Sequence, residues 1–143
     1  MNLDQNLLSL AASRDLGVLT TIKRDGRPQL SNINYHLDVE SRCARISLTD
    51  DRAKVKNLRR DARASLFVAS ADGWSYAVME GEVALSAVAA APDDVATDEL
   101  VEVYRAIRGE DHPDWDEYRR AMVADHRLVG RLTISHTYGI PPG

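Results

Sequence analysis

Apolar residues alternate with polar ones along much of the chain, and this period of two predicts a protein built mainly from β-strands. The segments concerned are rich in β-branched and apolar residues, as in LGVLTTIK at 16–23, which is typical of strands. Asp25-Gly26 and Asp72-Gly73 are tight-turn dipeptides that indicate hairpins. Strands are therefore predicted over 16–23, 28–37, 43–49, 63–70, 74–87 and 127–140.

In four places the apolar spacing becomes that of a helix. The clearest case begins at Leu100, from which apolar residues recur at i+3, i+4 and i+7 until Gly109 ends the helix. Acidic residues after Pro113 indicate the start of a further helix, because they favour its N-terminal dipole. Helices are predicted over 4–13, over about 51–60, and twice within 93–125. This order of elements favours a small antiparallel β-barrel with added helices over a doubly wound sheet.

Length and composition place the chain among ordinary globular domains. Its 143 residues fit one domain over 1–143, and the 44% hydrophobic and 28% charged residues argue against an intrinsically disordered chain. Cys43 is the single cysteine, which excludes an internal disulfide and a multi-cysteine zinc site. The four histidines lack metal-ligand spacing, so we expect no metal. Without an apolar run of about 18 residues or a secretory signal, we expect a cytoplasmic protein with no membrane partner.

Basic residues cluster in one short segment of a chain whose net charge is −4. The net charge disfavours nucleic-acid binding, yet six of the 18 Lys and Arg residues fall within twelve consecutive positions. If 51–60 is a helix, its first-turn N–H groups make a phosphate site together with Arg52 and Lys54. Asn57 lies three residues from Lys54 on the same face. The alternative is a solvated basic helix face, which we expect for Lys56, Arg59 and Arg60.

Polar and aromatic side chains mark two of the predicted strands. Gln29, Ser31 and Asn32 offer amide and hydroxyl groups suited to the edge of a heterocycle, and a solvent-facing polar strand is the alternative. Trp74 and Tyr76 lie two residues apart, so they share one face of a strand. These two aromatic side chains could flank a planar ring, form a subunit contact, or pack in the core.

No motif of enzyme catalysis occurs in the sequence. It contains no G-x-S-x-G, no H-E-x-x-H, no paired-carboxylate cluster, no G-x-G-x-x-G and no P-loop. Cys43 lies in a strand pattern and is expected to be a small buried hydrophobe rather than a nucleophile. An enzyme without its own acid, base or nucleophile must take its reactivity from a cofactor.

Four runs of sequence resemble a known family. They are GVLTTIKRDGRPQLSNINYH (17–36), DDRAKVKNLRRDARASL (50–66), DGWSYAVMEGEV (72–83) and ISHTYGIPPG (134–143). Together they resemble the actinobacterial F420-dependent reductases, the B type of flavin/deazaflavin oxidoreductases within the pyridoxamine phosphate oxidase-like split β-barrel superfamily. The combination of R-A-K-x-x-N-L-R with D-G-W-S-Y is specific, and the resemblance spans almost the whole chain.

The resemblance implies a mainly β (α+β) fold. This would be a six-stranded antiparallel split β-barrel with a short N-terminal helix, a basic helix and a two-helix insertion, assembled as a homodimer with cofactor sites at the interface. By position, Arg52, Lys54 and Asn57 would meet the phosphate and glutamyl tail of coenzyme F420. The residues that would line the deazaflavin or its ribityl chain are Gln29, Ser31, Asn32 and Ser47. Those that would border the same pocket, from either subunit, are Trp74, Ser75 and Tyr76.

The function implied is hydride transfer from reduced F420 to an unsaturated or quinone-like small organic acceptor. The anionic cofactor matches a basic cluster on an acidic chain, and the deazaflavin supplies the redox chemistry. No catalytic acid can be named from the sequence. Two alternatives stay open, namely an FMN-dependent enzyme like pyridoxamine phosphate oxidase, and a non-catalytic protein that binds or stores F420.

Overall fold

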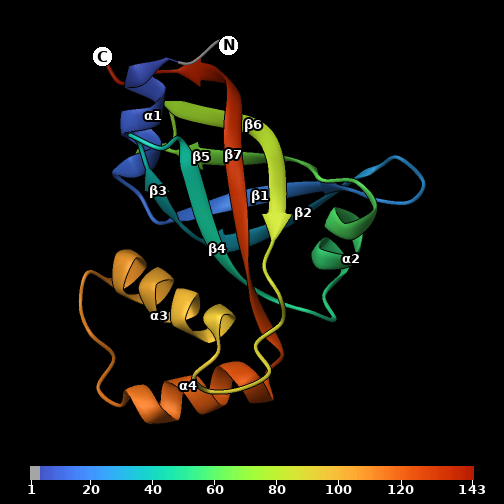
Figure 1. Ribbon diagram of the computed structural model, residues 1–143. Helices are drawn as coiled ribbons and strands as arrows, with labels where there is room; N and C mark the ends of the chain where they lie inside the picture. The colour runs from blue at the N-terminus through green and yellow to red at the C-terminus, as the bar shows by residue number, and fades with distance from the viewer. Residues whose placement is uncertain (1–3) are drawn as a thin grey trace.

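Seven antiparallel strands form one curled sheet with four helices around it in the computed structural model, which describes residues 4–143 (Figure 1). The strands are β1 (Leu16–Ile22), β2 (Pro28–Asn34), β3 (His36–Asp38), β4 (Cys43–Thr49), β5 (Arg63–Ala69), β6 (Tyr76–Leu85) and β7 (Arg127–Ile140). The helices are α1 (Gln5–Ala12), α2 (Ala53–Arg60), α3 (Val95–Arg108) and α4 (Trp115–Ala124). Within residues 4–143, no helix is both long and apolar enough to span a membrane.

The sequence predicts a single strand over 28–37, but the structure has two strands, β2 and β3, which Tyr35 separates. In the sheet order β2-β1-β5-β6-β7-β4-β3, these two strands are the outermost, although only Tyr35 separates them in sequence. The Tyr35 amide donates to the Asp15 carbonyl at 3.0 Å, and its buried hydroxyl donates to the Ala11 carbonyl at 2.5 Å. The prediction of six strands is wrong by one, because the chain stops pairing with β1 at this corner and then pairs with β4. The chain itself joins the two edges of the sheet, which becomes a half-barrel.

The inner face of the half-barrel carries the main hydrophobic core. Burial alternates along β1, β4 and β5, as the period of two predicts. Helix α1 covers one end of the sheet and contributes Leu8 and Ala11, both fully buried. Because most strands send apolar side chains into this core, the segments at the rim and the part of the outer face that α3 and α4 leave uncovered are available for binding. The core residues of the strands include Leu19, Ile46, Leu48, Leu66, Val68, Met79, Leu128 and Leu132.

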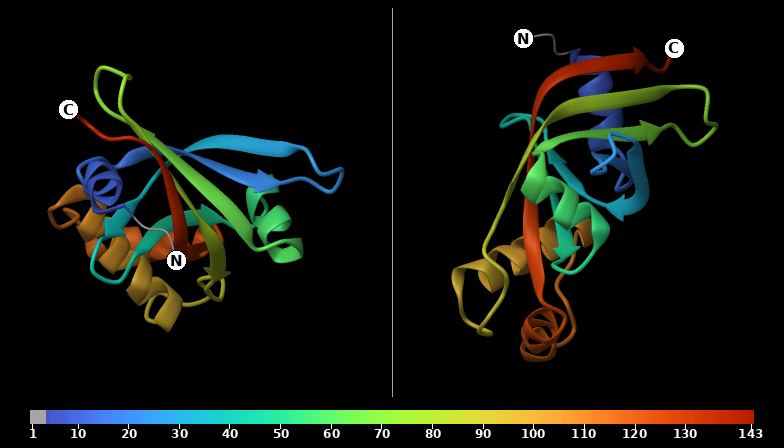
Figure 2. Two further views of the ribbon diagram at one scale, coloured as in Figure 1. Left: turned by 90° about the horizontal axis from the view of Figure 1, so that it is seen from above. Right: turned by 90° about the vertical axis from the view of Figure 1, so that its right-hand side faces the viewer.

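Helices α3 and α4 form a pair inserted between β6 and β7, beside β4 and the lower part of β7 (Figures 1 and 2). Asp94 caps α3 by accepting a hydrogen bond from the Thr97 amide at 2.8 Å. Gly109 ends α3 in the left-handed conformation with φ 70°, which confirms the predicted stop. The pair has a hydrophobic cluster of its own, which includes Leu100 and Met122 and reaches the sheet at Val129. The predicted two-helix insertion is therefore present.

The remaining predicted elements are confirmed with small shifts of their ends. The helices expected over 4–13 and 51–60 run over Gln5–Ala12 and Ala53–Arg60. The strand expected over 74–87 is shorter, since Trp74 and Ser75 belong to the turn before it. In that turn the Trp74 amide donates to Asp72 Oδ1 at 3.0 Å, and Gly73 adopts a positive φ of 81°.

Candidate functional site

The start of helix α2 concentrates positive charge without a carboxylate partner. The helix follows β4 directly, and its N-cap residue, Arg52, makes no side-chain hydrogen bond to the first turn. The first-turn N–H groups therefore lack a capping side chain, and they carry the positive end of the helix dipole. Arg127, at the first position of β7, lies on the same recess of about 570 Å³ as Arg52 and Thr49. Such a combination of amides and guanidinium groups favours an anion.

Lys54 lies between this recess and strand β2. Its Nζ donates to Ser31 Oγ at 3.1 Å. Partial burial lowers the pKa of Lys54, and the nearby charges of Arg52 and Arg127 lower it further. In the described part of the chain, none of these three cations forms an ion pair. Like charges held together without an ion-pair partner are destabilising, and a bound anion would relieve that repulsion.

Two carboxylates border the same recess. They belong to Asp51 and Asp125. Neither of them lies within ion-pair distance of a cation in the described residues. The rim of the recess therefore carries both positive and negative side chains. The additional positive charge is that of Lys54, whose hydrogen bond to Ser31 places it on the side of β2.

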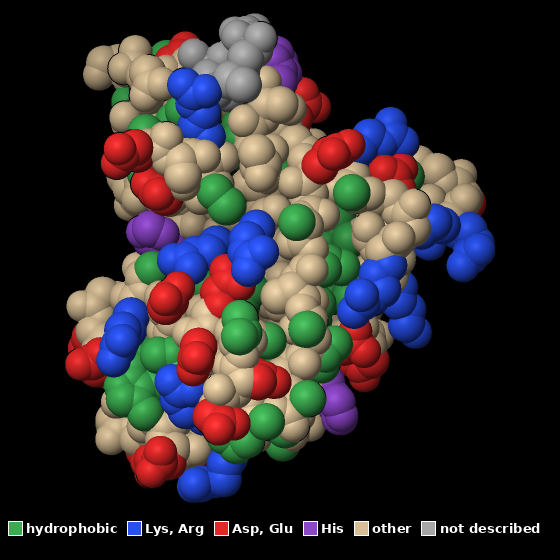
Figure 3. Space-filling view, viewed as in Figure 1, with side chains coloured by type: hydrophobic (Ala, Val, Ile, Leu, Met, Phe, Trp, Pro, Cys, Tyr) green, Lys and Arg blue, Asp and Glu red, His purple; other side chains and the backbone are tan. Residues whose placement is uncertain are grey.

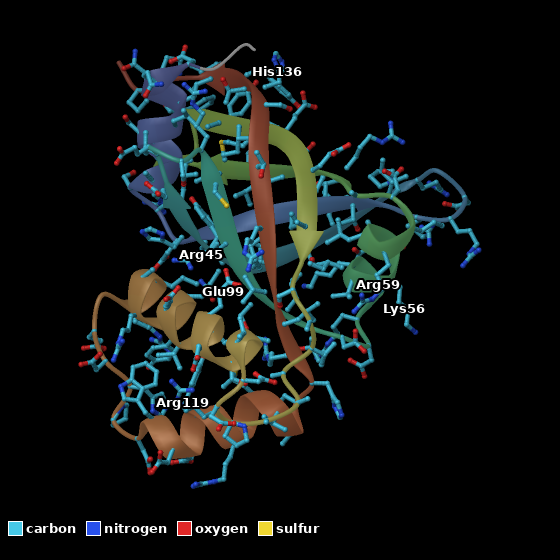
Figure 4. The ribbon with its side chains drawn as sticks, in the orientation of Figure 1. Arg45, Lys56, Arg59, Glu99, Arg119 and His136 are labelled. Atoms are coloured by element: carbon cyan, nitrogen blue, oxygen red, sulfur yellow. The ribbon has the colours of Figure 1, made fainter. Side chains whose placement is uncertain are left out.

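The other basic residues of α2 behave as a solvated face, as expected. Arg59 pairs with Asp50 at 2.5 Å, and Arg60 donates to the Ile22 carbonyl at 2.8 Å. Lys56 is exposed and points away from the sheet, as does Arg59 (Figure 4). Lys and Arg side chains gather over α2 and the tip of the β1–β2 hairpin, where Lys23 lies (Figure 3). This surface surrounds the anion site with further, exposed positive charge.

Asn57 is buried rather than presented to a ligand, with only 7% of its surface exposed. Its Nδ2 donates to Thr21 Oγ1 at 3.1 Å, and its Oδ1 accepts from Arg60 at 3.0 Å. Thr21 is fully buried and donates in turn to Gln29 Oε1 at 3.1 Å. This chain of hydrogen bonds ties α2 to β1 and β2. Asn57 and Gln29 thus hold the helix that carries Lys54.

Strand β2 presents its predicted polar residues on two different faces. Ser31 and Gln29 lie on the face that turns toward α2, whereas Asn32 lies on the opposite face and is exposed. Ser47 of β4 lies elsewhere, in a slot between the sheet and the helix pair, where its Oγ is 3.5 Å from Arg127 Nη1. The structure therefore brings Ser31, Lys54 and Arg52 together, and it separates Asn32 from them.

Trp74, Ser75 and Tyr76 lie far from α2 within one chain. Helix α2 immediately precedes β5, and these residues follow its other end, so the length of a seven-residue strand, about 20 Å, separates them. The view from above shows the β5–β6 turn and α2 on opposite sides of the sheet (Figure 2). Trp74 is 82% exposed, and the Tyr76 ring stacks on that of Phe67 at 5.6 Å. A single chain does not bring this aromatic segment to the anion site.

The outer face of the sheet is unusually apolar where it crosses β2, β1, β5, β6 and β7. Val18 pairs with Phe67, Phe67 with Val78, and Val78 with Tyr138, so these side chains form one row across four strands. Leu30 joins them around a shallow hollow of about 480 Å³. The large hydrophobic side chains exposed there are Leu30, Phe67, Tyr138 and Ile140. A continuous exposed apolar face of this kind marks an interaction surface.

Sequence reasoning missed Arg127 and Asn34, which line the slot between the half-barrel and the helix pair. No motif surrounds either residue, and Arg127 reaches Lys54 only through folding. Cys43 is half-buried, and burial raises the pKa of its thiol, so it stays protonated as expected of a packing residue. Among residues 4–143, no group of three or more His, Cys, Asp or Glu side chains is placed to hold a metal ion.

Comparison with known proteins agrees with this geometry. Residues 3–138 match the family described as pyridoxamine 5′-phosphate oxidase. A conserved hypothetical protein from Mycobacterium tuberculosis has a similar structure, with a TM-score of 0.74 and 19% identity over 99% of this chain and 86% of that one. A structure named F420 reductase has a TM-score of 0.67 and 18% identity, over 95% of this chain and 98% of that one. A heme binding protein from Mycobacterium smegmatis has a TM-score of 0.65 and 20% identity, over 94% of this chain and 52% of that one. At these identities the three structures support the split-barrel fold alone.

Proposed function

The chain belongs to the pyridoxamine 5′-phosphate oxidase family, and on that premise we propose that it is an F420-dependent oxidoreductase. It would transfer a hydride from reduced F420 to an unsaturated or quinone-like small molecule. The observation that carries the proposal is the unpaired cation cluster of Arg52 and Lys54 at the uncapped start of α2. The similarity to the structure named F420 reductase supports the choice of a deazaflavin.

The residues at α2 fit the phosphodiester of such a cofactor. A phosphate needs several N–H donors and a compensating charge, and the first turn of α2, Arg52 and Lys54 offer both. Ser31 already accepts a hydrogen bond from Lys54, so its hydroxyl lies beside the same position. Asn57 and Gln29 would act from behind by fixing α2 against the sheet. When bound, the deazaflavin supplies the hydride, and this chain binds and orients it.

Exposed basic residues extend beyond this site and would meet the acidic glutamyl tail. They lie on the solvent side of α2 and at the tip of the β1–β2 hairpin (Figure 3). These exposed charges are screened by salt, whereas the half-buried Lys54 is screened less. We therefore expect the tail to contribute salt-dependent affinity, and the phosphate site to contribute affinity that is less sensitive to salt. The residues concerned are Lys23, Arg24, Arg27 and Lys56.

A homodimer would complete the site. A two-fold axis through the exposed apolar face, between α2 and the β5–β6 turn, would bring the partner's turn to this chain's α2. Trp74, Ser75 and Tyr76 would then border the cofactor from the other subunit. Trp74 is 82% exposed in one chain, and the partner would cover it. Phe67 and Tyr138 would be covered at the interface.

An FMN-dependent oxidase acting on pyridoxamine phosphate or a similar amine is the second candidate. The description of the family favours it, and the phosphate of FMN would occupy the same cation cluster. The phosphate site by itself does not distinguish the two cofactors, so the choice between them depends on direct binding.

Titration of the purified protein with F420 and with FMN, each followed by fluorescence, tests both candidates. We expect saturable F420 binding that Lys54→Gln weakens by about 10- to 100-fold, as for the loss of a charge-assisted hydrogen bond. Arg120→Gln, which removes an exposed cation on α4 away from this surface, serves as the matched control and should leave the affinity unchanged. Tighter binding of FMN would support the oxidase, and no saturable binding of either cofactor would contradict the site.

A further inference from the structure

A slot of about 210 Å³ lies between the half-barrel and the helix pair. One wall is polar and is formed by Asn34, Ser47 and Arg127, from β2, β4 and β7. The other wall is mostly apolar, with Val103 of α3 and Met122 of α4, both buried, and it also includes Arg108 of α3. Since Asn34 is exposed, the slot opens to solvent on that side.

The helix pair that forms the apolar wall is firmly held to the sheet. Arg45 of β4 reaches Glu99 of α3 at 3.7 Å, and Arg131 of β7 pairs with the same carboxylate (Figure 4). Glu99 is mostly buried, so these contacts are shielded from solvent. The slot is therefore a fixed space rather than a gap between two loosely packed parts.

Arg127 is incompletely satisfied in the polar wall. Its Nε is buried and has no hydrogen-bond partner, the single buried side-chain nitrogen or oxygen of this kind in the described residues. Its Nη1 contacts Ser47 Oγ only at 3.5 Å, the outer limit of a hydrogen bond. Neighbouring arginines differ, because Arg45, Arg119 and Arg131 all pair with carboxylates. A buried unpaired guanidinium nitrogen indicates a missing acceptor, and an arginine is best satisfied by a carboxylate.

The apolar wall limits the rest of the ligand. Tyr118 adds its ring to the slot, while its hydroxyl donates to the Leu100 carbonyl at 2.9 Å. Burial raises the pKa of Tyr118 to about 12, so the phenol stays neutral at this wall. The volume equals that of about seven water molecules and suits one ring with a short side chain. A tricyclic cofactor ring system needs more room.

We propose that the slot binds a small, flat organic carboxylate, with its carboxylate on Arg127 and Ser47 and its ring between Val103 and Met122. Arg127 borders both the slot and the recess at α2, so the two sites are neighbours. The slot is formed by this chain alone and exists without a cofactor. Its occupancy can therefore be measured in the cofactor-free protein, apart from the proposed F420 activity.

Isothermal titration calorimetry of the cofactor-free protein with trans-cinnamate tests this site. We expect saturable binding that is at least about tenfold weaker for the neutral isostere cinnamamide and for Arg127→Gln. Arg120→Gln, an exposed arginine on α4, is the matched control and should bind as the wild type does. Lys54→Gln should also keep cinnamate binding while its F420 binding is weakened, which separates the two proposals.

NMR of the two indole N–H groups shows independently where cinnamate binds. Trp115 packs edge-on against Tyr104 and Tyr118 beside the slot, whereas Trp74 lies exposed in the β5–β6 turn. Cinnamate should shift the Trp115 resonance and leave that of Trp74 in place. If Arg127→Gln does not fold, Ser47→Leu, which fills the slot and keeps the arginine, should abolish binding. The proposal would be overturned if cinnamate did not bind, or if cinnamamide bound equally well. It would also be overturned if Lys54→Gln abolished cinnamate binding, or if cinnamate shifted only the Trp74 resonance.

Discussion

Asn57→Ala tests whether the buried amide of α2 holds the anion site to the sheet. The substitution removes the hydrogen bond from Asn57 Nδ2 to Thr21 Oγ1, between two side chains that are 7% and 0% exposed. Removing one partner of a buried hydrogen bond leaves the other partner, here Thr21, unsatisfied, and this lowers the free energy of unfolding by about 1–3 kcal/mol. Arg60 also loses an acceptor, but it is exposed and keeps the Ile22 carbonyl, so about 0.5 kcal/mol is expected there.

The net cost follows after one correction. Alanine is the better helix former by about 0.6 kcal/mol, which offsets part of the loss. The free energy of unfolding should therefore fall by about 2 kcal/mol. For 143 residues the unfolding entropy is about 0.3 kcal/mol/K, so Tm should fall by roughly 7 °C.

Urea denaturation followed by circular dichroism measures this change, with Lys56→Ala as the control. Lys56 is exposed on the same helix, so its replacement should alter the free energy of unfolding by less than about 0.5 kcal/mol. A loss for Asn57→Ala no larger than that of the control would refute the reasoning, because the amide would then contribute nothing as a buried link between α2 and β1.

Three further predictions follow from single contacts. Anion binding should restore the lowered pKa of Lys54, so calorimetry in buffers of different ionisation enthalpy should detect proton uptake at alkaline pH. Affinity should then fall as pH rises through the pKa of the free protein, and a pH-independent affinity would contradict this. Asp94→Ala should cost about 1–2 kcal/mol at pH 7, because the carboxylate accepts from three backbone amides, including that of Thr97. Those bonds hold the pKa of Asp94 well below its usual range, so urea titrations should show its contribution intact above the unfolded-state pKa and lost only as pH falls through the lowered value. Tyr35→Phe should cost about 1–2 kcal/mol through the lost bond to the Ala11 carbonyl, and an unchanged denaturation midpoint would contradict this.

The sequence could predict elements that local pattern determines. Strand alternation, the turn at Gly73 and the helix stop at Gly109 each depend on a few neighbouring residues, and all three are confirmed. The break at Tyr35 could not be predicted, because β2 and β3 keep the same alternation across it. The chain changes partner there through contacts with Asp15 and Ala11, which are 20 and 24 residues away.

The candidate site was predictable only in part, for the same reason. A basic helix start is visible in the sequence, and in the structure neither Arg52 nor Lys54 forms an ion pair there. Helical spacing places Asn57 near Lys54, but it does not reveal that Thr21 binds its amide inside the protein. Arg127 joins the cluster from 73 positions beyond Lys54, and no local signal marks it.

The helix pair is inserted between two strands that are already neighbours. β6 and β7 pair from Tyr76 and Ile140 to Leu85 and Gly130, so a short hairpin would connect them equally well. The inserted segment also carries its own apolar cluster. The insertion is thus not required for the pairing of β6 with β7, and it could be exchanged or lengthened as long as its packing on Val129 and its ion pairs from Glu99 are kept. Changes in the insertion would alter one wall of the neighbouring slot, while the start of α2, which belongs to the barrel, would stay unchanged.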